Sequence, residues 1–376
     1  MKKILLFGAV LFMSTPIFAQ MKLIKKLLSN QKDTTRSASF LPVPSFGYSQ
    51  ETGLQFGVGA IYSFYIDRKD TTNRSSNFST TATYSTKRSY NFSLFGDVWT
   101  KGNRYHILEE IRFKKLPFSF YGLGNNTKAA DEDKLIQQLI KLNFDLEKNT
   151  AKNAYTGVSV GFEDYAFDDK NPGGILDSGK NILDKDGGHV LYVGLSQSYD
   201  TRNSNNYPTK GFFGRVTYQY APNVFGGQNF EGSKIGLNLR NFWRLGNRFV
   251  LGAQGIYNNV LSQNTPFYLL PQLGNDEIMR GYYSGRYRDK NLLALQAELR
   301  YRYNNRFGAV IFAGAGTVWG ISEFSVDNFK PNLGGGLRYF FDPAKGLSIR
   351  IDYGIGEKRP AEKRQSGLYI SLAEAF

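Results

Sequence analysis

The chain contains no cysteine, only two histidines and no long apolar segment. Without cysteine, the fold cannot be held by disulfides. A hydrolase or acyltransferase needs a histidine base beside a serine, and neither His106 nor His189 lies in a serine-rich constellation. No stretch of about 18 apolar residues is present, so no transmembrane helix is predicted. These absences favour a non-enzymatic protein.

Sequence motifs for cofactors and metals are missing as well. There is no Walker loop, zinc-ligand spacing or dinucleotide fingerprint. The segment Asp184-Lys185-Asp186-Gly187-Gly188 is similar to the start of a calcium loop, but the downstream glutamate that would complete it is absent. A solvated turn accounts for this segment, so we expect no cofactor and no metal.

The N-terminus has the layout of a secretory signal peptide. Two lysines precede the apolar run from Ile4 to Met13, and the small residue Ala19 offers a cleavage site. Residues 1–19 are therefore predicted to be removed on export. Residues 20–42 are polar and basic, with leucines and an isoleucine at helical spacing, and we expect a short periplasmic helix and linker there.

The rest of the chain is rich in aromatic residues, with 24 tyrosines and 30 phenylalanines, yet its mean hydropathy is −0.39. Such a combination indicates strands that alternate between apolar and polar residues, as in a soluble β-sandwich or a membrane β-barrel. Turn-forming clusters separate sixteen such segments. They lie near 43–49, 53–66, 75–87, 89–100, 103–115, 135–148, 152–166, 188–203, 210–222, 229–245, 247–261, 291–304, 307–319, 330–342, 345–356 and 366–376.

Loop lengths distinguish the barrel from the sandwich. If the N-terminus is periplasmic, the connections on the outer side include the long segments 115–134, 166–188 and 262–290. Those on the periplasmic side include very short ones, such as 304–307. Outer-membrane barrels show this asymmetry and have an even number of strands. A very short outer connection at 50–52 and a longer inner one at 67–74 fit less well.

The alternation also assigns side chains to the two faces of the barrel wall. In the segment from Asn291 to Tyr303, Leu295 and Leu299 fall on one face, and Gln296 and Glu298 fall on the other. In a barrel the apolar face contacts lipid and the charged face lines the lumen. We therefore predict an all-β, 16-stranded antiparallel transmembrane β-barrel over residues 43–376.

The last segment ends on an aromatic residue. Leu368, Ile370, Leu372 and Phe376 are expected to share one face, with only Glu374 interrupting the pattern. A terminal aromatic after alternating apolar positions resembles the C-terminal signal by which outer-membrane barrels are recognised for insertion. The barrel-assembly machinery is therefore an expected partner for this chain's own insertion.

The net charge of +15 raises the question of nucleic-acid binding. The basic residues are spread along the chain instead of clustering with aromatic residues on one element, so nucleic acid is not an expected partner. Cationic lumen walls, and loops that face anionic outer-membrane lipid and lipopolysaccharide, account for the charge.

Loop 6, the connection at 262–290, contains Met279-Arg280-Gly281-Tyr282. An arginine followed by glycine and an aromatic residue, ahead of an alternating strand, resembles the BamA/TamA superfamily of barrel-assembly and protein-translocation factors, whose sixth outer loop carries such a motif into the lumen. Further matches occur in the same order along the chain. They are Asp200-Thr201-Arg202, Tyr207 to Gly211, Phe312 to Gly316, Gly335 to Arg338 with Asp342-Pro343, and Asp352-Tyr353-Gly354.

The resemblance implies that Arg280, Gly281 and Tyr282 dock in the lumen, where the arginine needs a carboxylate partner. Family members often have an aspartate on the strand after the loop-bearing hairpin, and Gly314 stands at that position here. We therefore expect Glu298 to hold Arg280 alone, with a solvated Arg280 as the alternative. Only a short linker precedes the barrel, so capture of clients by POTRA domains is not expected.

The expected function is accordingly that of a Gram-negative outer-membrane barrel that takes part in inserting, moving or stabilising outer-membrane proteins. Client outer-membrane proteins and periplasmic factors are its expected partners. Pro42 and Pro44 withhold backbone donors from the first strand, so its pairing with the last strand should be short. The alternatives are a passive pore or structural barrel without assembly activity, and a secreted soluble β-protein.

Overall fold

The structure is a computed structural model that describes residues 35–49, 53–179, 182–226, 229–320 and 323–376. The predicted signal peptide and residues 20–34 of the predicted linker lie outside the described residues. The first strand begins at Ser39, so the expected boundary at residue 43 falls inside the strand. None of the described helices is long and apolar enough to cross a membrane.

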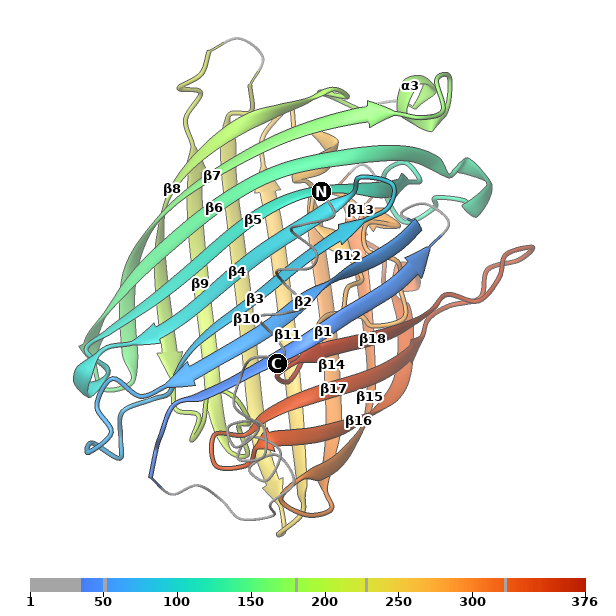
Figure 1. The fold of residues 1–376 in the computed structure, drawn as a ribbon. Helices are drawn as coiled ribbons and strands as arrows, with labels where there is room; N and C mark the ends of the chain where they lie inside the picture. The colour runs from blue at the N-terminus through green and yellow to red at the C-terminus, as the bar shows by residue number, and fades with distance from the viewer. Residues whose placement is uncertain (1–34, 50–52, 180–181, 227–228, 321–322) are drawn as a thin grey trace, which may run out of the picture.

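Sixteen antiparallel strands follow one another around a barrel (Figure 1), each bonded to the strand before it. A separate two-stranded ladder, β12 (Gln272–Leu273) with β13 (Tyr287–Arg288), lies within loop 6. The sixteen strands are β1 Ser39–Ser49, β2 Gly53–Phe64, β3 Ser76–Ser85, β4 Tyr90–Trp99, β5 Tyr105–Phe120, β6 Asp133–Ala151, β7 Ala154–Asp169, β8 Gly187–Asp200, β9 Gly211–Ala221, β10 Gly232–Leu245, β11 Phe249–Leu261, β14 Asn291–Arg302, β15 Phe307–Trp319, β16 Lys330–Asp342, β17 Leu347–Ile355 and β18 Ser366–Leu372.

Every strand predicted from the alternation is present, and the predicted fold class is confirmed. The largest differences are at strand ends. β5 continues to Phe120, past the predicted end at residue 115, because its last residues pair with the start of β6 as far as Asp133. β18 ends at Leu372, four residues before the predicted end.

The two faces of the wall have opposite chemistry. Leu295 is 51% exposed on the outside, whereas Glu298 and Arg300 on the inner face are fully buried. Outward-facing side chains such as Val160, Leu195 and Ile370 are likewise apolar and exposed. A soluble protein would bury the apolar face and expose the charged one, so this distribution is that of a membrane barrel.

The two ends of the barrel differ, and we call them the loop end and the turn end. The loop end carries the long connections 121–132, 170–186 and 262–290, and the turn end carries short ones such as 303–306. The longer turn-end connection at 65–75 is not loose, because Asn73 donates hydrogen bonds to the carbonyl of Thr100 at 2.9 Å and to Asn103 Oδ1 at 3.1 Å in the next turn.

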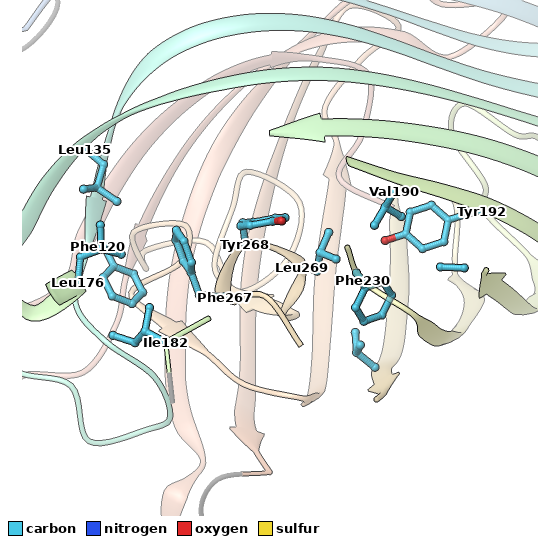
Figure 2. Close-up of a cluster of buried hydrophobic side chains, with 12 residues drawn as sticks. Phe120, Leu135, Leu176, Ile182, Val190, Tyr192, Phe230, Phe267, Tyr268 and Leu269 are labelled. Atoms are coloured by element: carbon cyan, nitrogen blue, oxygen red, sulfur yellow. The ribbon is translucent and has the colours of Figure 1, made fainter. Parts of the chain in front are cut away.

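Buried apolar side chains fill the lumen near the loop end (Figure 2). Phe120 and Leu135 come from the wall, Leu176 from the short helix α3 (Ile175–Ser178), and Phe267, Tyr268 and Leu269 from loop 6. Burying one such side chain fully contributes roughly 1.5–3 kcal/mol. The cluster therefore anchors residues 267–269 of loop 6 against the wall.

The sheet has two edges, β1 and β18, which lie next to each other in Figure 1. No backbone ladder joins these two strands within the described part of the chain. Side-chain contacts to the β16–β17 region hold the β1 edge in place instead. Leu41 packs with Phe341 and Leu347 near the turn end, and Lys345 Nζ donates to the carbonyl of Ser37 at 2.6 Å and to Ser39 Oγ at 2.9 Å.

Candidate functional site: the tip of loop 6

Loop 6 leaves β11, passes through a 3-10 turn at Phe267–Leu269 and forms the β12–β13 ladder before it enters β14. The segment between β12 and β13 carries the motif. Its side chains Met279, Arg280 and Tyr282 are buried, although the segment belongs to a loop. The tip therefore lies inside the barrel and is not a solvated outer loop.

Arg280 is fully buried and contacts two carboxylates. One guanidinium nitrogen donates to Asp352 Oδ2 on β17 at 2.6 Å, and the other donates to Glu298 Oε1 on β14. The guanidinium also stacks 3.6 Å from the ring centroid of Phe312 on β15. Moving a guanidinium from water to a buried site costs several kcal/mol. Here two charge-assisted hydrogen bonds and the stacked Phe312 ring offset that cost.

The expectation that Glu298 alone would hold Arg280 is wrong, because Asp352 is a second acid. Gly314, which stands where an acidic residue was sought, has another role. A Cβ at Gly314 would lie 2.7 Å from the carbonyl oxygen of Leu295 and 2.8 Å from Asn332 Oδ1. The glycine thus leaves space for Asn332, whose amide donates to the carbonyl of Arg280 at 2.9 Å.

The carboxylates that hold Arg280 also bind other arginines. Glu298 Oε2 accepts from Arg300 Nε at 2.9 Å. Asp352 accepts from Arg338 at 2.5 Å and from Arg350 at 3.1 Å. The loop arginine therefore joins a network of wall residues that spans β14, β16 and β17 and is almost completely excluded from solvent.

The backbone at the tip requires the glycine of the motif. Gly281 has φ +111°, a conformation that L side chains rarely adopt, and a Cβ there would lie 2.8 Å from backbone atoms of Gly354 and Ile355. Its amide donates to Tyr369 Oη on β18 at 2.9 Å. The tip therefore presses directly against the backbone of β17 and touches β18.

Tyr282 is the third residue of the motif and is 1% exposed. Its hydroxyl donates to the carbonyl of Pro331 at 2.6 Å and accepts from the amide of Glu357 at 2.9 Å. Its ring lies against Gly356, where a Cβ would come within 2.7 Å. Tyr282 thus connects the tip of loop 6 to β16 and to the β17–β18 connection.

The residues proposed as a C-terminal insertion signal do not all share one face. Leu368 and Ile370 are 66% and 67% exposed on the outer wall, and Leu372 is partly buried against Leu41 and Phe341. Phe376 is 4% exposed and packs against Phe242 inside the barrel, so the expectation that it shares a face with Leu368 and Ile370 is wrong. The chain turns inward at Ala373, which has φ +67°.

The two histidines occupy different surroundings. His106 lies on the inner wall, 3.0 Å from Glu147 and 2.9 Å from Asp97, and its ring stacks on Trp99. The nearby hydroxyls of Ser196 and Ser198 donate to Glu147 and not to the imidazole, so no serine–histidine pair forms there. A serine that acts as a nucleophile would need to donate to the imidazole, which serves as its general base.

His189 is exposed on the outer face, 3.0 Å from Asp164. Residue 184 lies at a turn with φ +52°. Within the described residues, no group of three histidine or acidic side chains is arranged to hold a metal ion.

A sixteen-stranded antiparallel wall with loop 6 docked in its lumen is the architecture of an outer-membrane-type barrel. Comparison with protein-family models shows the family. The model described as the Omp85 superfamily domain matches residues 46–376, so the chain belongs to the Omp85 superfamily. This finding confirms the resemblance inferred from the loop 6 motif. No curated protein matches the sequence.

Solved structures show the same fold. The chain is similar to "The crystal structure of BamA from Haemophilus ducreyi lacking POTRA domains 1-3", with a TM-score of 0.53 and 15% identity over 90% of this chain and 70% of that one. CdiB from Acinetobacter baumannii and CdiB from Escherichia coli each give a TM-score of 0.55, with 11% and 10% identity over 90% of this chain. The chain spans 60% and 62% of the two CdiB chains.

Proposed function

We propose that this chain is a non-enzymatic outer-membrane barrel that helps other outer-membrane proteins insert into the membrane or cross it. Membership of the Omp85 superfamily supports the proposal. The observation that carries it is the combination of a firmly docked loop 6 with a sheet edge that no backbone ladder closes in the described residues. Such a barrel keeps its lumen filled while one seam stays weak.

The seam gives a physical route for insertion. An unpaired strand edge offers backbone donors and acceptors to an incoming strand, and such edges are strong templates for pairing. On β1, Pro42 and Pro44 each lack an amide hydrogen, which weakens pairing at this edge. A client strand would add to β1 or β18 from the membrane side, while loop 6 keeps the lumen closed.

Membrane placement follows from the same proposal. The exposed apolar outer wall fits a lipid bilayer, and the signal peptide at 1–19 would deliver the chain to the outer membrane of a Gram-negative bacterium. Outer-membrane lipid and lipopolysaccharide, the barrel-assembly machinery and unfolded client barrels are the proposed partners. A periplasmic factor would be needed to deliver the clients if no POTRA domain does so.

Insertion of a client into vesicles tests the proposal. The purified barrel is reconstituted in phospholipid vesicles, and the folding of an added, urea-denatured outer-membrane barrel is followed by its heat-modifiable migration. We expect faster folding than in empty vesicles, and a loss of this effect in Arg280→Met. Arg248→Met is the matched control, because Arg248 is an exposed turn-end residue that lies away from loop 6 and donates to Tyr301 Oη at 3.5 Å. Equal folding rates with and without the barrel would leave a passive structural barrel as the better description.

A further inference from the structure

The connection between β8 and β9 at the turn end reaches across the lumen. These are the eighth and ninth of the sixteen strands, so their connection starts halfway around the sheet from the seam between β1 and β18. We call residues 201–210, which form this connection, the strap. The strap nevertheless binds residues on both sides of the seam, 130 and 139 positions away in the sequence. It therefore spans the turn end of the barrel.

On the N-terminal side of the seam, the strap is bound to the β2–β3 connection. Arg74 Nη1 lies 3.0 Å from Asp200 Oδ2 at the end of β8, and Arg74 Nη2 donates to the carbonyl of Arg202 at 3.1 Å. Asn205 Nδ2 donates to the carbonyl of Ser75 at 2.8 Å, and Ser75 Oγ donates to Asn205 Oδ1 at 3.0 Å. These contacts fix the strap to the strands that lead to the β1 edge.

Asn206 binds both sides of the seam with one side chain. Its Nδ2 donates to Ser75 Oγ and to the carbonyl of Lys345, each at 3.1 Å. Its Oδ1 accepts from Asn77 Nδ2 on β3 at 2.9 Å. Lys345 lies in the β16–β17 turn, on the C-terminal side of the seam. Asn206 is buried, so these hydrogen bonds would be costly to leave unmade.

Tyr207 packs against the C-terminal side of the seam. Its ring meets the ring of Phe340 on β16 edge-on, with centroids 5.1 Å apart. Gly346 in the β16–β17 turn provides the space, because a Cβ there would lie 2.5 Å from the Cβ of Tyr207. The glycine also has φ +72°, a conformation that L side chains rarely adopt. The β16–β17 turn is therefore shaped to receive the strap.

Lys345 connects the strap to β1. Its carbonyl accepts from Asn206, and its Nζ donates to the carbonyl of Ser37 and to Ser39 Oγ at the start of β1. The ammonium also pairs with Asp342 Oδ2 at 2.9 Å, which holds the lysine against β16. One residue of the β16–β17 turn is thus bound by the strap through its backbone and binds the β1 edge through its side chain.

We propose that the strap keeps the turn end of the seam shut by binding the strands on both sides of it. No backbone ladder joins β1 to β18 in the described residues, so side-chain contacts must hold the two edges together. Opening the turn end would move the β16–β17 turn away from the β2–β3 connection. Asn206 would then lose either Lys345 or its partners Ser75 and Asn77. The inference concerns closure of the seam and does not depend on insertion of clients.

Thiol labelling at the seam tests this role of the strap, because the sequence contains no cysteine. Leu41 on β1 is 7% exposed and packs with Phe341 and Leu347 across the seam, so Leu41→Cys reports opening of the turn end. In the purified barrel, without any client, Leu41→Cys should react slowly with a charged, water-soluble maleimide. Adding Asn206→Ala should raise the rate roughly 10-fold, as expected when shielded hydrogen bonds are lost.

Asn291→Ala is the matched control. The Asn291 side chain also makes three hydrogen bonds, to Tyr257, Asn259 and the carbonyl of Trp319. Its partners lie at the loop end, on β11 and β15, and full ladders already join these strands to β14. The control therefore removes a similar set of contacts without touching the strap or the seam, and it should leave the labelling rate unchanged.

A second variant guards against a strap that stays seated. Asn206→Ala/Tyr207→Ala removes both side-chain contacts with the C-terminal side and should label faster than Asn206→Ala. If heat-modifiable migration shows that it does not fold, Asn77→Ala breaks the bond on the other side of the seam and should raise the rate instead. Labelling of Leu41→Cys that stays slow in these folded variants would overturn the proposal. An equal rise in Asn291→Ala would also overturn it, because any loosened wall would then expose the seam.

Discussion

Substitution of the residues around Arg280 separates a two-acid site from a one-acid site. Arg280→Met removes the hydrogen bonds to Glu298 and Asp352 and the stacking on Phe312. Loss of one partner of a buried pair costs about 3–5 kcal/mol, although Arg300 and Arg338 continue to neutralise the two acids. We therefore expect docking of loop 6 to weaken by about 3 kcal/mol, or roughly 100-fold in its opening equilibrium.

Each acid alone should matter less than the arginine. Glu298→Gln leaves Arg280 bound to Asp352, and Asp352→Asn leaves it bound to Glu298, so each should cost about 1.5–3 kcal/mol, the contribution of one charged hydrogen bond. The double variant Glu298→Gln/Asp352→Asn should exceed either single one, because Arg280 then has no carboxylate. Adding Arg280→Met to the double variant should cost little more, since the same contacts are already lost.

Native-state proteolysis measures these opening equilibria. Chymotrypsin is suitable because Tyr282, Tyr283 and Tyr287 lie in loop 6 and none of the variants removes them. Cleavage rates at several protease concentrations give the opening free energy of the folded barrel. The account is refuted if Glu298→Gln opens the loop as much as Arg280→Met does and Asp352→Asn leaves it closed. That result would restore the one-acid site expected from the sequence.

Three further predictions concern the wall, the tip of loop 6 and the loop end. Cysteines at Leu295 and Leu299 should react with a membrane-soluble reagent, and those at Gln296 and Glu298 should not. Equal labelling of both sets would contradict the assignment of the two faces of the wall. Leu295→Arg should lower the stability of the barrel by about 2–4 kcal/mol if the site lies near mid-bilayer. Gly281→Ala should undock the tip, seen as faster chymotrypsin cleavage, because its Cβ meets backbone at 2.8 Å; an unchanged rate would show that the tip relaxes freely. At the loop end, burial alone would raise the pKa of Glu362, but the amide of Ala129 and the guanidinium of Arg286 hold this pKa below its ordinary value of 4.5. The contact with Arg286 should therefore persist at pH 5 and be lost as the pH falls through the lowered value. The measurement is the hydrogen-exchange protection of 121–132 and 356–365, taken relative to the intrinsic exchange rate at each pH, and protection that falls as the pH rises above 5 would contradict this.

The sequence was sufficient to predict the sixteen strands, since period-two alternation is local and repeats along each strand. It also predicted that Glu298 contacts Arg280, because loop 6 and strand β14, which carries Glu298, follow each other directly in the chain. Asp352 was missed, although Asp352-Tyr353-Gly354 had been noted as a family match. Which residues of distant strands reach the same height in the lumen depends on the tilt of the barrel and the path of the loop, and neither is local.

The inward turn of residues 373–376 was missed for a different reason. Counting by twos from Leu368 and Ile370 continues onto Phe376, but Ala373 breaks the extended conformation. One signal was available. The same count places Glu374 on the lipid face, where a carboxylate is unfavourable, and this conflict indicated that the strand ends earlier.

The seam between β1 and β18 decides whether the barrel works as proposed. Val43→Cys and Leu372→Cys place thiols on the two edge strands, where both native side chains pack against one apolar cluster. A control pair, Val158→Cys with Leu195→Cys, links β7 to β8, which are already joined by a full ladder.

The most direct measurement is the rate of client folding in vesicles that contain the cross-linked barrel. We predict that a reducible cross-link between residues 43 and 372 abolishes the acceleration, that reduction restores it, and that the control cross-link has no effect. Undiminished acceleration with the seam locked would contradict lateral opening as the mechanism.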